Sequence, residues 1–155
     1  LDALRPGTSA QCFSGTDEEL KETKNTQPCM FAVELAAAAA LTEAGIKADR
    51  AAGFSLGELA ALTYTGAVEF KTGFELVCRR GELMQSAAEE QPTAMAAVLK
   101  LPNEKVEELC GQFPETYPVN YNCPGQVSVA CAKEQLAPFS AAVKAAAIKS
   151  GVARI

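Results

Sequence analysis

The sequence predicts an α/β protein, and three of its features support this class. From Thr93 onward, apolar and amphipathic runs alternate in the order β-α-β-β-α-β. Before that, a short apolar run leads into a glycine-flanked turn at Ser55 and then into a helix-forming segment. Two long segments with strong helical character flank that turn, so helices and strands are both expected.

The first part of the chain is predicted to be largely helical. Residues 1–15 are rich in Gly, Ser, Thr and Pro and are expected to form an irregular lead-in, followed by a short helix starting at Asp17. A longer helix is expected over residues 27–44 with Thr26 as its N-cap, and its many alanines predict burial on most sides. A second long helix is expected over residues 70–89.

The second part of the chain predicts a small, separate subdomain. Its element order is that of a ferredoxin-like unit, βαββαβ. A break near Pro92 divides the sequence into residues 1–92 and residues 93–155. The predicted elements are a strand (94–99), a helix (103–113), two strands joined by a tight turn (117–122 and 126–131), a helix (133–150) and an extended segment (152–155).

Composition excludes several classes of protein. Of the 155 residues, 48% are hydrophobic and 21% are charged, which supports a globular core and argues against extended disorder. The 19 acidic and 14 basic residues give a net charge of −5, so a nucleic-acid partner is not expected. No membrane-length apolar run and no secretory leader occur in the sequence. We therefore expect a cytoplasmic protein without membrane contact.

Cysteine and histidine usage limits the chemistry. The six cysteines form no C-x-x-C pair, so reduced, packed thiols are expected and a metal site is not. The chain contains no histidine, which removes the commonest general base from any reaction that it could catalyse alone.

The segment Gly53-Phe54-Ser55-Leu56-Gly57 matches a nucleophile elbow, G-x-S-x-G. In such a turn the serine adopts a strained conformation between a strand and a helix, and glycines let the two approach closely. Ser55 is therefore a candidate nucleophile, and the backbone N–H of Leu56 is a candidate donor to an oxyanion. The alternative is a turn that matches the pattern by chance.

Arg80 lies on the apolar face of the helix expected over residues 70–89. Its neighbour Arg79 faces Glu75 and Glu82, and we expect it to form exposed ion pairs. A guanidinium on an apolar face is costly unless an anion meets it, and its planar fork suits a carboxylate. Arg80 could bind a ligand carboxylate, pair with an internal acid, or extend past the edge of the core.

The ordered set of motifs resembles the malonyl-CoA:acyl carrier protein transacylases of fatty-acid synthesis and the related acyltransferase domains of polyketide synthases. Order and spacing agree from about Asp17 to Ile155. The matching segments are Thr26-Gln27-Pro28, the Ser55 turn through Glu58, Arg80-Gly81 with Met84-Gln85, Ala94 to Val98, and Asn122 to Gln126.

This resemblance implies an α/β-hydrolase-like core with an inserted ferredoxin-like subdomain. It also implies an enzyme that transfers a malonyl group from malonyl-CoA to the phosphopantetheine thiol of acyl carrier protein, without a further cofactor. Ser55 would form a malonyl-serine ester, the N–H of Leu56 would contribute to the oxyanion hole, and Arg80 would hold the malonyl carboxylate.

Parts of the family pattern are not found in this sequence. The Gly-Gln-Gly loop that precedes the matched region and the catalytic histidine that follows it have no counterpart here, and Phe54 stands where the family usually has histidine. We expect an internal fragment that lacks both ends and would transfer malonyl groups poorly alone. Two other functions stay open: a serine hydrolase on the same elbow, and a non-catalytic scaffold or interaction domain.

Overall fold

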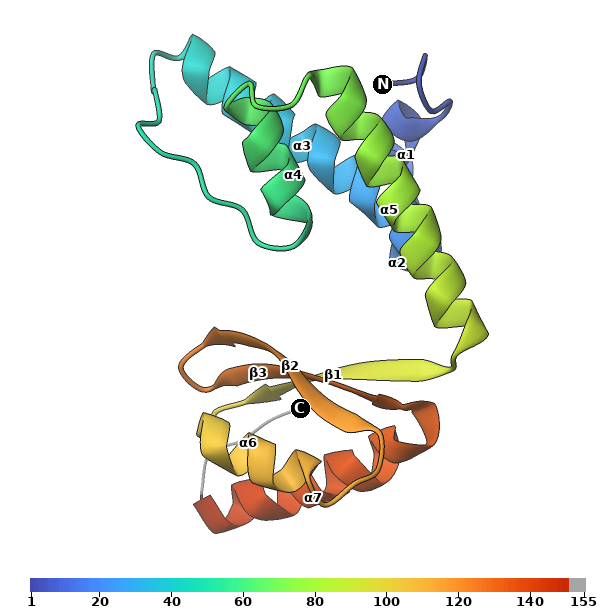
Figure 1. Cartoon of the computed structure of the whole chain (residues 1–155), viewed down its shortest axis with the longest axis vertical. Helices are drawn as coiled ribbons and strands as arrows, with labels where there is room; N and C mark the ends of the chain where they lie inside the picture. Colours follow the sequence, from blue (N-terminus) through green and yellow to red (C-terminus); the bar gives the residue numbers. More distant parts are fainter. Residues whose placement is uncertain (151–155) are drawn as a thin grey trace. The chain divides into compact units, whose positions relative to one another are not determined.

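The computed structural model describes residues 1–150 and divides the chain into two compact units between Glu89 and Glu90. This division lies close to the break predicted at Pro92. The first unit contains helices and the second contains helices and a sheet, so the α/β class is confirmed (Figure 1). Within the described residues, no helix is both long and apolar enough to cross a membrane.

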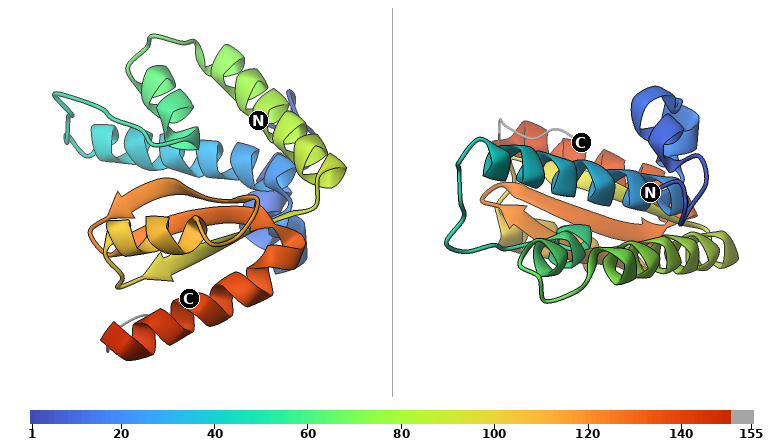
Figure 2. Two further views of the ribbon diagram at one scale, coloured as in Figure 1. Left: turned by 60° about the horizontal axis from the view of Figure 1, so that its bottom comes forward. Right: turned by 90° about the horizontal axis from the view of Figure 1, so that it is seen from above.

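The first unit consists of five helices joined by loops (Figure 2). A capping box starts α2, because the Thr16 side chain accepts from the N–H of Glu19 and the Glu19 carboxylate accepts from the N–H of Thr16. The helices are α1 (Thr8–Ser14), α2 (Asp17–Lys21), α3 (Thr23–Glu43), α4 (Leu56–Tyr64) and α5 (Phe70–Glu90, whose last residue belongs to the second unit).

The expectation of an irregular lead-in over residues 1–15 is wrong, because α1 forms there. Tertiary contacts stabilise this short helix, and sequence periodicity does not report them. Thr8 is fully buried, and the Arg5 guanidinium donates to Thr8 Oγ1, Gln11 Oε1 and Asn25 Oδ1. The last of these hydrogen bonds ties the start of the chain to α3.

Two expectations for the long alanine-rich helix are also wrong. Its N-cap is Glu22 rather than Thr26, whose hydroxyl instead donates to the carbonyl of Glu22 at 3.2 Å inside the helix. Burial is confined to the N-terminal part, which the other helices cover. Phe31 and Ala32 are buried, whereas most of the alanine run is exposed.

The expectation of a strand before Ser55 is also wrong. Residues 51–54 form a loop, and residues 1–89, all of which are described, contain no strand. A strand requires a hydrogen-bonded neighbour, and this unit offers none. The core of the unit instead lies between helices, where Phe31, Ala60, Phe74 and Val77 form the buried cluster. The ring of Phe31 packs against Phe74 and also against Phe70, which is exposed.

The second unit is a three-stranded antiparallel sheet with two helices on one face (Figure 1). The strand order is β1-β3-β2, with Met95 opposite Ala130 and Ala130 opposite Tyr117. The elements are β1 (Thr93–Leu99), α6 (Asn103–Cys110), β2 (Thr116–Cys123), β3 (Gln126–Ala132), η1 (Lys133–Gln135) and α7 (Leu136–Ser150).

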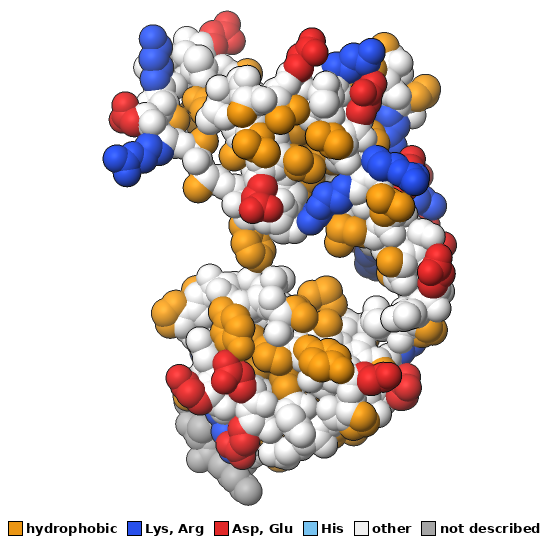
Figure 3. All heavy atoms as spheres, in the orientation of Figure 1, with side chains coloured by type: hydrophobic (Ala, Val, Ile, Leu, Met, Phe, Trp, Pro, Cys, Tyr) orange, Lys and Arg blue, Asp and Glu red, His pale blue; other side chains and the backbone are white. Residues whose placement is uncertain are grey.

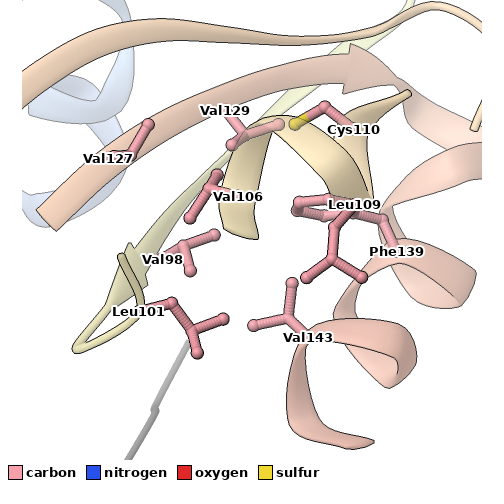
Figure 4. Packing of buried hydrophobic residues seen from close by; sticks show 9 residues of the cluster. All are labelled: Val98, Leu101, Val106, Leu109, Cys110, Val127, Val129, Phe139 and Val143. Carbon is pink, nitrogen blue, oxygen red and sulfur yellow. The ribbon is translucent and has the colours of Figure 1, made fainter. Parts of the chain in front are cut away.

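The elements expected between residues 94 and 150 are therefore confirmed, with small shifts at their ends. The extended segment expected at residues 152–155 lies outside the described residues. The core of this unit consists of one side-chain cluster between the sheet and the two helices (Figure 4), made by Val98, Leu101, Val106, Leu109, Cys110, Val127, Val129, Phe139 and Val143.

Both units also present large apolar side chains at their surfaces (Figure 3). On the second unit, Met95 and Tyr117 flank Ala130 on the sheet face that the helices do not cover, and both are exposed. On the first unit they include Phe54, which is 68% exposed and directly precedes the candidate nucleophile.

Candidate functional site

Ser55 occupies a strained turn at the start of α4. Its φ of 55° and ψ of −111° lie in a region that non-glycine residues rarely adopt, and it is the N-cap of the helix. The N–H of Gly57 bonds the carbonyl of Phe54 at 2.9 Å and the N–H of Glu58 bonds that of Ser55 at 3.2 Å. These bonds close the turn and leave Ser55 exposed.

The sharpness of this turn depends on Gly53. A Cβ atom at this position would lie 2.0 Å from the carbonyl oxygen of Gly57 and 2.3 Å from the nitrogen of Glu58. Contacts this short are impossible, so only glycine allows the chain before Ser55 to pass so close to the first turn of α4. This is the close approach that the G-x-S-x-G pattern predicted, although a loop rather than a strand enters the turn.

Arg80 on α5 reaches the serine directly. Its Nη2 atom donates to Ser55 Oγ at 2.9 Å, and its Nη1 atom donates to Gln27 Oε1 at 2.6 Å. Both partners are neutral, and no acidic side chain among residues 1–150 forms an ion pair with Arg80. The internal ion pair left open by the sequence is therefore absent from the described residues, and a positively charged group lies beside the serine hydroxyl.

The neighbouring arginine behaves differently. Arg79 pairs with Glu82 at 3.2 Å, and both side chains are largely exposed, as the sequence predicted, whereas Glu75 pairs with Lys71 at 3.9 Å. A surface pair of this kind contributes about 0–1 kcal/mol to stability. Of the two arginines, only Arg80 bonds Ser55. Arg79 therefore carries a surface charge, and Arg80 carries the charge of the candidate site.

Gln27 is the site residue that the sequence did not reveal. It lies in the second turn of α3, is only 4% exposed, and accepts the hydrogen bond from Arg80. The Thr26-Gln27-Pro28 segment indicated a helix start, which gave no reason to assign its glutamine a contact on another helix. No local pattern marks Gln27, because its burial and its contact with Arg80 arise only where α3 and α5 meet.

Gly81 allows α5 to come close to α3 at this point. A Cβ on Gly81 would lie 3.0 Å from the Cα of Lys24 and 3.1 Å from the carbonyl oxygen of Thr23. The side chain of Gln85 holds the same junction, since its Oε1 accepts from the N–H of Thr23 at 3.1 Å. These contacts bring Arg80 and Gln27 together from different helices.

Leu56 is the first residue of α4, where backbone N–H groups have no partner within the helix. Its N–H has no hydrogen-bond acceptor among residues 1–150. A base is not found beside the serine: within the described residues, no carboxylate bonds Ser55, and the sequence holds no histidine. The site thus combines a hydroxyl, a free N–H and a cation.

Comparison with known proteins identifies the family. Residues 8–155 match the acyl transferase domain family, and the chain therefore belongs to it. The malonyl CoA-acyl carrier protein transacylase of Escherichia coli K12 is 39% identical over 139 residues, covering 87% of this chain and 45% of the relative. That of Bacillus subtilis 168 is 36% identical over 132 residues, covering 83% and 42%. The chain spans about half the length of the curated relatives it matches.

Solved structures show the same relationship. A type II polyketide synthase acyl carrier protein in complex with its malonyl transacylase matches with a TM-score of 0.83 and 39% identity, over 94% of this chain and 48% of the matched chain. The malonyl CoA-acyl carrier protein transacylase of Coxiella burnetii matches with a TM-score of 0.84 and 28% identity, over 99% and 48%. The family resemblance drawn from the sequence is confirmed.

Proposed function

We propose that this protein transfers a malonyl group from malonyl-CoA to the phosphopantetheine thiol of an acyl carrier protein in fatty-acid synthesis. The observation that carries the proposal is the 2.9 Å contact between Arg80 Nη2 and Ser55 Oγ, made by an arginine without an acidic partner in residues 1–150. In a malonyl-serine ester, one methylene group separates the ester carbonyl from the free carboxylate. A guanidinium that touches Oγ is therefore within reach of that carboxylate.

The reaction proceeds in two steps, acylation of Ser55 and transfer of the malonyl group to the phosphopantetheine thiol. Ser55 Oγ attacks the thioester carbonyl, loses its proton to a base, and forms the ester as the carbon–sulfur bond breaks and the CoA thiol leaves with a proton. The phosphopantetheine thiol then loses its proton to the same base and attacks the ester carbonyl, the bond between the carbonyl carbon and Oγ breaks, and Oγ leaves with a proton. In each step the N–H of Leu56 stabilises the negative oxygen of the tetrahedral intermediate, and Arg80 holds the carboxylate.

The base is the part of the mechanism that these residues do not supply. The family resemblance implies a histidine, and this sequence has none. Because the matched relatives are about twice as long, we propose that the base comes from sequence outside these 155 residues. The isolated chain should then transfer malonyl groups very slowly, since a serine hydroxyl without an adjacent base is a weak nucleophile.

We also propose a fold type for each of the two parts of the chain. We assign residues 1–92 to an α/β-hydrolase-like core and residues 93–155 to an inserted ferredoxin-like subdomain. Support for the second assignment comes from the strand order β1-β3-β2, which leaves β1 at an edge where the fourth strand of a βαββαβ unit pairs. Acyl carrier protein is the proposed partner, and a cytoplasmic location stays a prediction.

Intact-mass analysis of the longest natural form of the protein, mixed with malonyl-CoA, tests the proposal. The unsubstituted protein should gain one malonyl group, the Ser55→Ala variant none, and acyl carrier protein should then remove the group. Release of free malonate without transfer would instead indicate a serine hydrolase. Absence of any acylation would indicate a non-catalytic scaffold, and either result would overturn the proposal.

A further inference from the structure

We infer that Gln27 positions Arg80 for the substrate carboxylate, an inference that rests on the proposed function. Gln27 is buried on α3, whereas Arg80 projects from α5. The hydrogen bond between them, 2.6 Å from Nη1 to Oε1, is the shorter of the two that the guanidinium makes with residues 1–150. Gln27 itself does not contact Ser55 in the structure, so it would act through Arg80 as a positioning residue.

The remaining contacts of Gln27 fix which way its amide faces. Its Nε2 atom donates to Thr23 Oγ1 at 2.8 Å and lies 3.3 Å from Met84 Sδ. A thioether sulfur can only accept, so the nitrogen must face Met84 and the oxygen must face Arg80. The amide therefore presents an acceptor to the guanidinium and cannot turn over without losing these bonds.

Holding one nitrogen of a guanidinium orients the others, because the group is planar. With Nη1 fixed by Gln27, Nη2 is directed at Ser55 Oγ, where the malonyl group is attached in the proposed intermediate. A neutral amide restrains the arginine and leaves its charge available. A glutamate at the same place would pair with that charge and repel an incoming carboxylate.

Two substitutions in the longest natural form of the protein test this role. Gln27→Met keeps the size of the side chain and removes the acceptor, while Gln27→Glu adds a competing charge. Loading of Ser55 by malonyl-CoA should fall about tenfold in kcat/KM for Gln27→Met and roughly a hundredfold for Gln27→Glu. Loading by acetyl-CoA, which has no free carboxylate, should change by less than about twofold.

Gln11→Met is the matched control. Gln11 Oε1 accepts a hydrogen bond of 2.7 Å from Arg5, so this variant also removes a glutamine–arginine bond from the same unit. It should leave the preference for malonyl-CoA over acetyl-CoA unchanged. If Gln27→Met lowers loading by both thioesters equally, Gln27 is merely structural and the inference is overturned.

A second measurement separates failure of the inference from failure of the proposed function. Nitrogen-15 NMR of the Arg80 side chain should show separate, slowly exchanging Nη signals in the unsubstituted protein and averaged signals in Gln27→Met. Unchanged signals would overturn the positioning role. If the unsubstituted protein takes up no malonyl group, the proposed function fails, and the NMR comparison alone then decides whether Gln27 orients Arg80.

Discussion

Arg80 on α5 donates a hydrogen bond of 2.9 Å to the hydroxyl of Ser55 at the start of α4. The strained turn presents the hydroxyl, and the close approach of α5 to α3 at Gly81 carries the guanidinium. The cation contacts the candidate reacting atom without any movement of the chain. The choice of acyl group should accordingly depend on this one side chain.

Arg80→Ala should therefore lower loading of Ser55 by malonyl-CoA and spare loading by acetyl-CoA. A charge-assisted hydrogen bond contributes about 1.5–3 kcal/mol, so kcat/KM for malonyl-CoA should fall roughly 10- to 150-fold. Arg80→Lys should recover only part of the loss, since an ammonium cannot bind a carboxylate through two parallel bonds. Competition between the two thioesters, read by intact mass, measures the change.

Arg79→Ala is the control for that experiment, because Arg79 is the adjacent arginine and pairs with Glu82 at the surface. It should leave the ratio of malonyl to acetyl loading unchanged. An equal loss of selectivity in both variants would show that general positive charge, rather than the placement of Arg80, is responsible.

The cysteines should differ strongly in reactivity. Burial raises the pKa of Cys110 to about 11, and burial together with the neighbouring Cys12 thiol raises that of Cys29 to about 11. Both thiols are therefore almost fully protonated at pH 8, whereas Cys123 is exposed. Brief treatment of the folded protein with iodoacetamide, followed by peptide mass analysis, should find Cys123 alkylated first. Faster labelling of Cys29 or Cys110 would contradict the described packing.

The same shifts predict a loss of stability in alkali. A thiol whose pKa rises on folding holds its proton more tightly in the folded state than in the unfolded state. The resulting stabilisation is present below the unfolded pKa of about 9 and is lost as the pH rises toward 11. The urea midpoint of unfolding should fall across that interval. Replacing Cys29 and Cys110 with alanine should make the fall shallower.

The sequence predicted those residues of the candidate site whose placement depends on their near neighbours in the chain. The glycine pattern around Ser55 follows from steric exclusion within a few residues, and a charge on an apolar helix face singled out Arg80. Gln27 could not be found in this way, because its role depends on two helices meeting at Gly81. Contacts between distant segments leave little trace in local periodicity.

The same distinction explains the errors in the fold. The second unit was predicted closely because its strands alternate and its turn residues are distinctive. Helix α1 was missed because buried Thr8 and the Arg5 hydrogen bonds stabilise it, rather than its own propensity. The apolar run before Ser55 suggested a strand, but a strand also needs a neighbour, which residues 1–89 do not provide.

Gly53→Ala should be severely destabilising, whereas Gly57→Ala should be tolerated. The new Cβ at position 53 would lie 2.0 Å from the Gly57 carbonyl oxygen, so the turn or the first turn of α4 must shift. Overpacking of this kind costs about 1–3 kcal/mol or more. At position 57 a Cβ has nothing within 4 Å, and alanine in a helix is favoured over glycine by about 1 kcal/mol.

Chemical unfolding of the two glycine variants, with the unsubstituted protein beside them, measures the difference. The free energy of unfolding should decrease for Gly53→Ala and stay level or increase for Gly57→Ala. Equal destabilisation by both would mean that the close approach at Gly53 does not exist in solution.

Ser55→Gly should stabilise the protein while removing the candidate nucleophile. Ser55 has φ 55°, and strain in such a sparsely populated conformation costs about 1–3 kcal/mol. Glycine adopts positive φ without a Cβ clash, so this variant should unfold at a higher denaturant concentration than Ser55→Ala, which keeps the strain. Both variants lose the hydroxyl that bonds Arg80, so their comparison isolates the backbone contribution. If Ser55→Gly is no more stable than Ser55→Ala, the positive φ of residue 55 does not lower the stability of the folded protein, and the turn is not strained.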